Sequence, residues 1–112
     1  MKIQSAKSKG RRGQKEVVAK ILGHFPQLSE RDVRSTSMGV TGDDIQLSEA
    51  ATLKFPFSVE VKNQEKLNIW EAIKQVEARA KLKPLVIFKR NGTELYCVIK
   101  FDHLLEVLNY EA

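Results

Sequence analysis

The amino-acid sequence predicts one α/β domain in which a central mixed β-sheet is flanked by helices. Two observations carry this prediction. With 112 residues, of which 42% are hydrophobic, the chain has the size and composition of a single compact domain with one core. Apolar residues recur with helical spacing in some segments and with strand spacing in others, and the segments follow one another in the order α-β-β-β-α-β-β-α.

The first twelve residues predict a flexible basic arm, and the folded domain is expected to follow as residues 13–112. Residues 1–12 contain no acid, and their basic residues are Lys2, Lys7, Lys9, Arg11 and Arg12. Such a stretch is either a solvated terminus or a tail that neutralises phosphates. The residues of the arm leave both interpretations open.

Residues 13–23 predict the first helix. The apolar residues recur at helical spacing, and a glycine followed by a proline gives a stop signal: Val17, Val18, Ile21, Leu22 and Phe25, then Gly23 and Pro26. Glu16 falls in the first turn of this predicted helix, where the helix dipole favours an acid in any protein. A purely structural role is therefore an alternative for Glu16.

Three strands are expected next, over residues 32–36, 45–48 and 57–62. Residues 49–54 form a turn or a short excursion between the last two. Pro56 opens the third strand, where it costs no ladder hydrogen bond. Because strand residues two apart share a face, Glu60 and Lys62 lie together, opposite Val59 and Val61. One face of this strand is therefore predicted to be charged.

A second helix is predicted from Asn68 to about Lys81, because Asn68 and Glu71 resemble a capping box and an apolar stripe follows them. Residues 85–88 form an apolar run typical of a strand buried on both faces. Asn91-Gly92 predicts a two-residue hairpin to a strand over residues 94–100, and residues 101–108 form an amphipathic segment that could cap the sheet. Cys97 is expected to be a buried core thiol, and Trp70 to pack in the core or at an interface.

Composition narrows the function classes. The formal net charge of +5 is compatible with a polyanionic partner. With a single cysteine, the chain can form neither an internal disulfide nor a cysteine-type zinc site. No apolar run has signal-peptide length at the N-terminus, and none approaches the roughly 18 residues of a membrane span. We expect a soluble cytoplasmic protein without a membrane partner, and a phage gene is among its possible sources.

Three charged residues, Asp44, Glu60 and Lys62, could meet at one point if the strands that carry them lie side by side. Cleavage of a phosphodiester with a divalent metal needs hard oxygen ligands close together and a cation or base near the attacking water. Asp44 and Glu60, with the main-chain carbonyl of Val61, would suffice for Mg²⁺, and Lys62 could orient or deprotonate the water. Asp43 competes with Asp44 for the ligand role, although the apolar run that starts after Asp44 favours Asp44.

The pattern Asp44-Ile45-Gln46-Leu47 followed by Val59-Glu60-Val61-Lys62 resembles the PD-(D/E)xK nuclease signature, with Gly42-Asp43-Asp44 where Pro-Asp often stands. Together with the basic opening at residues 10–16, it is most similar to the archaeal and phage-type Holliday junction resolvases. The resemblance implies a restriction-endonuclease-like fold and a Mg²⁺ cofactor, with Mn²⁺ as a second suitable ion and no small-molecule cofactor. It implies that Asp44 and Glu60 are the metal ligands, Lys62 the catalytic lysine and Glu16 a third acid. It makes Gln75 the glutamine that some members carry, although a plain surface role is an alternative there.

A junction resolvase acts on four-way DNA as a homodimer, because two facing strands must be cut symmetrically. The candidate interface surfaces are residues 95–99 and 101–108, which could equally complete the core. The residues expected to contact DNA are Lys9, Arg11, Arg12, Arg34, Ser35, Lys66 and Lys74, together with Arg79 and Lys81. The alternatives are another nicking or restriction-type nuclease of the same superfamily, or a noncatalytic basic DNA-binding module.

Overall fold

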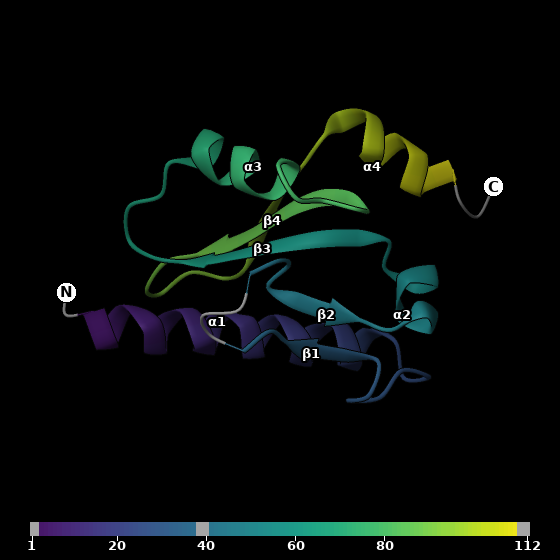
Figure 1. The fold of residues 1–112 in the computed structure, drawn as a ribbon, viewed down its shortest axis with the longest axis horizontal. Coiled ribbons are helices and arrows are strands. Elements are labelled where there is room, and N and C mark those ends of the chain that lie inside the picture. The colour runs from purple at the N-terminus through teal and green to yellow at the C-terminus, as the bar shows by residue number, and fades with distance from the viewer. Residues whose placement is uncertain (1–2, 38–40, 110–112) are drawn as a thin grey trace.

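A computed structural model describes residues 3–37 and 41–109 of the chain. Two small sheets form its centre, and helices lie on both sides (Figure 1). The smaller sheet pairs β1 (Val33–Ser35) with β2 (Ile45–Leu47) in antiparallel fashion. The larger is mixed: β3 (Phe57–Asn63) runs parallel to β4 (Lys83–Lys89), which pairs antiparallel with β5 (Tyr96–Ile99). The structure thus confirms an α/β domain with a mixed sheet.

The strands do not form one central sheet as predicted. Asp44 approaches β3 as the next strand of a sheet would, since its N–H donates to the Val59 carbonyl at 2.9 Å. The pairing then stops, because the Asp44 side chain and not its carbonyl accepts the N–H of Val61 at 2.7 Å. The Asp44 carbonyl accepts instead from Thr36 N. Among the described residues, the hydrogen bonds between β3 and the region of the smaller sheet therefore come from one residue, Asp44.

Four helices complete the described chain: α1 (Ile3–His24), α2 (Glu49–Lys54), α3 (Ile69–Glu77) and α4 (Phe101–Leu108). In Figure 1, α1 and the β1–β2 pair lie below the larger sheet, and α3 and α4 lie above it. The N-cap prediction for α3 is confirmed, because the Asn68 side chain accepts from Glu71 N. The helix ends at Glu77 and not near Lys81, so Arg79 and Lys81 lie beyond it.

The prediction of a flexible arm over residues 1–12 is wrong for residues 3–12, which form the first half of α1; residues 1 and 2 lie outside the described residues. Lys9 is buried and its ammonium pairs with Glu65 at 3.1 Å, while its carbonyl accepts from Asn63 Nδ2 at 2.9 Å. These contacts tie the N-terminal half of α1 to the end of β3. Glu16 therefore lies inside the helix and not in its first turn.

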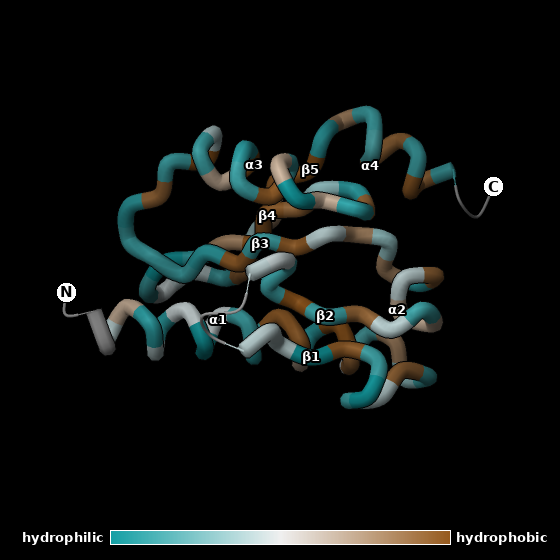
Figure 2. Tube along the Cα trace, viewed as in Figure 1, coloured by the Kyte–Doolittle hydropathy of each residue, from teal (hydrophilic) through white to brown (hydrophobic). Residues whose placement is uncertain are grey.

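The core lies in two layers on the two faces of β3 and β4. On one face, Val59, Val61 and Leu85 pack with Val17 and Ile21 of α1. On the other, Val86 packs with Ala72 and Val76 of α3. Figure 2 shows hydrophobic residues, in brown, on β3 and β4 between α1 and α3. The predicted alternation along β3 is confirmed, because Val59 and Val61 face α1 while Glu60 contacts Arg79 and Lys62.

Three predictions about residues on or near the larger sheet are corrected in whole or in part. Residues 90–95 join β4 to β5, so the connection is longer than a two-residue hairpin, and within the described residues only glycines, Gly92 among them, have positive φ. A type I′ turn needs positive φ at Asn91 as well. Cys97 is exposed because β5 is an edge strand of the sheet formed by the described residues. Trp70 is also exposed, so it does not pack in the core, and its packing at an interface stays a prediction.

Among residues 3–37 and 41–109, none of the helices combines the length and apolarity that crossing a membrane requires.

Candidate functional site

The candidate site lies at the edge of β3, where Asp44 meets Glu60 and Lys62. Two main-chain contacts fix Asp44 against this strand: its N–H donates to Val59 O, and its Oδ2 accepts the N–H of Val61 at 2.7 Å. Val61 lies between Glu60 and Lys62 in β3, so its hydrogen bond brings Asp44 next to these two charged residues. The three residues singled out from the sequence are therefore neighbours.

Glu60 is nearly buried, and both of its oxygens face cations. Lys62 Nζ lies 3.4 Å from Oε2, and Arg79 Nη1 lies 2.6 Å from Oε1. A carboxylate removed from water is costly unless such partners compensate it. The pairs explain how β3 carries an acid at a position enclosed between α3 and the segment around Asp44.

Arg79 also joins the site to the preceding acid and to the backbone. Its Nε lies 3.2 Å from Asp43 Oδ1, and its Nη2 donates to the carbonyl of Val59 at 3.0 Å. Asp43 and Asp44, adjacent in sequence, thus have different partners: Asp43 binds Arg79, and Asp44 binds the main chain of β3. This difference separates the two candidates for the ligand role by geometry.

Burial raises the pKa of the Asp44 carboxyl from 3.8 to about 6, and the negative charge of Glu60 acts in the same direction. The hydrogen bond from Val61 N and the positive charges of Arg79 and Lys62 oppose the rise in this pKa without cancelling it. A raised pKa in a charged cluster is a feature of functional sites. The carboxyl of Asp44 changes charge near neutral pH as a result.

The side chains of two other expected site residues, Glu16 and Gln75, make no hydrogen bond or ion pair with this cluster among the described residues. Glu16 pairs with Lys89 of β4 at 3.1 Å. Gln75 is exposed on α3, and only its main-chain carbonyl contacts Arg79. Within residues 3–37 and 41–109, no group of three or more His, Cys, Asp or Glu side chains is arranged to hold a metal.

The donor set nevertheless has the chemistry that Mg²⁺ prefers, namely one or two carboxylates with waters completing the shell. Asp44 offers an oxygen, because only its Oδ2 accepts a hydrogen bond within the described part of the chain. Glu60 could add a second oxygen once Arg79 moves away from Oε1. Val61, whose carbonyl is the third expected ligand, follows Glu60 along β3 and donates its N–H to Asp44. The residues present therefore fit a hard divalent cation, on condition that one ion pair opens.

Most residues expected to contact DNA are exposed. Arg11 and Arg12 lie on α1, Arg34 on β1, Lys66 before α3 and Lys74 on α3. Arg34 donates to the side chain of its cross-strand neighbour Gln46, and Ser35 is half-buried beside it. Lys9 is the exception: it is buried and paired with Glu65, so it is not open to a phosphate in this structure.

Comparisons of the chain with protein-family models, with curated proteins and with solved structures found no match.

The residue that sequence reasoning underrated is Arg79, expected only as a phosphate contact. Its spacing of four from Gln75 suggests a helix face, but α3 ends before it and the guanidinium turns back to β3. A second overlooked residue is Gln14, buried on α1, whose Oε1 has no hydrogen-bond partner among the described residues. The glutamine lies one residue after Gly13, in the segment expected to begin the helix, and no sequence signal marks it.

Proposed function

We propose that this chain is a metal-dependent endodeoxyribonuclease of restriction-endonuclease-like fold that cuts four-way DNA junctions as a homodimer. The observation that carries the proposal is the hydrogen bond from Val61 N to Asp44 Oδ2, because it unites the two halves of the D…ExK pattern at one edge of β3. The raised pKa of Asp44 adds support, because acids whose pKa is shifted by burial are concentrated at functional sites.

In this proposal Mg²⁺, or Mn²⁺ in its place, would act as a Lewis acid toward the phosphate and make water a stronger acid. Asp44 and Glu60 would hold the cation, and the Val61 carbonyl would add a third oxygen. Lys62, half-buried beside Glu60, orients the attacking water or stabilises the charge that develops on the phosphate. Glu16 does not enter this scheme, because its carboxylate pairs with Lys89.

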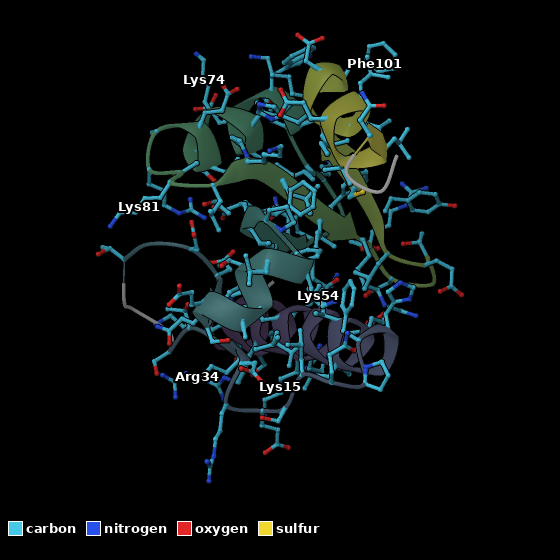
Figure 3. All side chains as sticks on the ribbon, turned by 90° about the vertical axis from the view of Figure 1, so that its right-hand side faces the viewer. Lys15, Arg34, Lys54, Lys74, Lys81 and Phe101 are labelled. Carbon is cyan, nitrogen blue, oxygen red and sulfur yellow. The ribbon has the colours of Figure 1, made fainter. Side chains whose placement is uncertain are left out.

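The placement of basic side chains is consistent with a DNA-binding surface. Figure 3 shows Lys74, Lys81 and Arg34 spread along one side of the molecule, and Phe101 on another. The candidate site shares the first of these sides, since Lys81 follows Arg79 by two residues and its N–H donates to Ser58 on β3. Contacts of these cations with phosphates would position DNA without reading its bases.

An apolar stripe on α4 supports the homodimer. Phe101, Leu104, Leu105 and Leu108 are 69%, 37%, 43% and 66% exposed, and their spacing of three and four residues puts them on one helix face. Within the described residues, α4 has no fully buried side chain. Larger exposed apolar patches on soluble proteins commonly mark interaction sites. Residues 101–108, expected either to cap the sheet or to form an interface, leave this face free for a second copy.

The central test is cleavage of a synthetic four-way junction by Glu60→Gln in Mg²⁺. We expect cleavage to fall at least about a hundredfold, because a ligand carboxylate is lost, while junction binding measured in Ca²⁺ persists. Glu94→Gln is the matched control, since Glu94 is exposed in the connection between β4 and β5. Retained cleavage by Glu60→Gln would refute the mechanism, and equal cleavage of plain duplex would favour a nicking or restriction-type nuclease.

One observation favours a second candidate, the noncatalytic DNA-binding module. Arg79 already neutralises Glu60 without any metal, as it would in a purely structural ion pair. In that case the wild-type protein binds junctions but cuts no DNA in Mg²⁺ or Mn²⁺, and Glu60→Gln changes neither property.

A further inference from the structure

Arg79 occupies one oxygen of the acid that a metal would need. Its Nη1 lies 2.6 Å from Glu60 Oε1, its Nε lies 3.2 Å from Asp43 Oδ1, and its Nη2 donates to Val59 O at 3.0 Å. One guanidinium thus bridges two carboxylates and a main-chain carbonyl. Such a planar fork of donors satisfies acids that would otherwise repel each other.

Asp44 keeps its position without Arg79. Its N–H donates to Val59 O at 2.9 Å, its carbonyl accepts from Thr36 N at 2.8 Å, and its Oδ2 accepts from Val61 N at 2.7 Å. Two of the three partners, Val59 and Val61, lie on β3, and the third, Thr36, follows β1 directly. The direct effect of Arg79 therefore falls on Glu60 and Asp43, and not on the placement of Asp44.

Glu60 cannot bind Arg79 and a divalent cation through the same oxygen. Mg²⁺ is bound at about 2.0–2.1 Å, and a guanidinium 2.6 Å from the same oxygen would meet it at close range with like charge. The second oxygen faces Lys62 at 3.4 Å, a longer contact. Opening the Arg79 pair is therefore the condition for two-carboxylate binding.

Arg79 is able to leave. It lies beyond the end of α3, and its side chain is partly exposed, so rotation toward solvent requires no movement of the helix. We propose that Arg79 exchanges partners: it blocks Glu60 in the metal-free protein, and when a divalent cation takes Glu60 it pairs with a DNA phosphate. This inference rests on the proposed nuclease function, and it adds that Arg79 competes with the metal for Glu60 until a DNA phosphate offers the guanidinium another partner.

The test is titration of the DNA-free protein with Mn²⁺ by isothermal calorimetry. Arg79→Gln is expected to bind Mn²⁺ about tenfold more tightly than the wild type, because its cation no longer competes for Glu60. Lys81→Gln is the matched control: it removes a nearby positive charge that has no contact with Glu60, and its Mn²⁺ affinity is expected to change less than twofold. In Ca²⁺, Arg79→Gln is expected to bind four-way DNA several-fold more weakly than Arg31→Gln, which removes an exposed charge elsewhere.

Unchanged or weaker Mn²⁺ binding by Arg79→Gln overturns the exchange. The nuclease proposal survives that result if wild-type cleavage still depends on Glu60. Absence of Mn²⁺ binding by both the wild type and Arg79→Gln overturns both proposals. If Arg79→Gln does not fold, Arg79→Lys serves instead: its ammonium cannot bridge both acids in the same plane, so Mn²⁺ is again expected to bind more tightly than to the wild type.

Discussion

The carboxyl group of Asp44 contributes both to the fold and to the candidate metal site. Its side chain replaces a main-chain carbonyl as the acceptor for Val61 N, so the carboxyl completes the edge of β3. Burial raises the pKa of this group to about 6. A residue that completes a strand edge in this way couples the protonation state of the site to the stability of the fold.

Replacement of Asp44 by Asn is expected to change the pH dependence of stability. Because the folded-state pKa of about 6 exceeds the ordinary 3.8, the folded protein keeps a proton that the unfolded chain loses. The stability due to this proton is present below about pH 4 and is lost as the pH rises to about 6. Asn keeps an oxygen that can accept from Val61 N, but it does not titrate. The free energy of unfolding of Asp44→Asn relative to the wild type should therefore rise by about 1–2 kcal/mol as the pH increases from 4 to 7.5, after a discount for partial exposure.

Urea denaturation of metal-free protein across this pH range measures the difference. Asp102→Asn, on the exposed face of α4, is the control for the loss of a surface carboxylate. Parallel pH profiles for Asp44→Asn and the wild type would contradict a raised pKa for Asp44.

At the residue scale, local patterns predicted which charges meet but not all of their partners. The alternation of valines with Glu60 and Lys62 was sufficient to put the two charges on one face of β3. The partner of Glu60 could not be inferred in the same way, because it depends on where α3 ends: one more turn of helix would have directed Arg79 elsewhere. Glu16 was misplaced for a similar reason, since its position in the helix depends on a start at Ile3.

At the scale of elements, α1 packs closely on β3 at Gly13. A Cβ added there would lie 3.0 Å from Asn63 Cβ and 3.3 Å from Val61 Cγ1. Because Asn63 Cβ is fixed to the strand backbone, it cannot move without moving β3. The glycine therefore sets the distance between the helix and the strand that carries the candidate site.

Gly10 and Gly13 make a matched pair of substitutions within one helix. An alanine is favoured over glycine in a helix interior by about 0.5–1 kcal/mol. Gly10→Ala should gain this amount, because nothing lies within 4 Å of its added Cβ. Gly13→Ala should instead lower the free energy of unfolding by about 1 kcal/mol, through the crowding against β3. Urea denaturation measures both, and an equal gain at the two positions would show that α1 can shift away from the strand.

Elements with strong local signals were predicted well, and those fixed by distant contacts were not. The strand around Glu60, the Asn68 cap and the helix over residues 101–108 follow from spacing and capping within the segment. The N-terminal half of α1 depends on Asn63 and Glu65, more than fifty residues away. Likewise, the split into two sheets depends on whether the side chain or the main-chain carbonyl of Asp44 accepts the N–H of Val61. No local sequence pattern indicates which of the two accepts it.

At the scale of the whole molecule, the apolar stripe of α4 lies apart from the basic side that carries Lys81 and Arg34 (Figure 3). A dimer formed through this stripe would leave both candidate sites free to contact DNA. Two sites related by a two-fold axis are what symmetric cleavage of a junction requires.

Leu105→Glu is expected to convert the dimer to a monomer, because a charge at the centre of the stripe would be buried without a partner. Its melting temperature at low concentration should stay within a few degrees of the wild type, since Leu105 is exposed in the single chain. Sedimentation velocity measures the change, with Ala19→Glu on the exposed face of α1 as control. A wild-type protein that sediments as a monomer, or a Leu105→Glu protein that remains dimeric, would exclude this surface.

The parallel pairing of β3 with β4 also orders the events of folding. An antiparallel neighbour such as β5 can join β4 by closing a short connection, whereas a parallel neighbour needs a crossover, provided here by α3. Loop closure over longer distances is slower, so β4 and β5 are expected to meet before β3 docks on them. By the same reasoning Asp44 can meet β3 before β3 docks on β4, because the Val61–Asp44 hydrogen bond spans 17 residues, whereas Val61 and its β4 partner Ile87 lie farther apart in the chain. A newly made chain is therefore expected to bring Asp44, Glu60 and Lys62 together before its main sheet is complete.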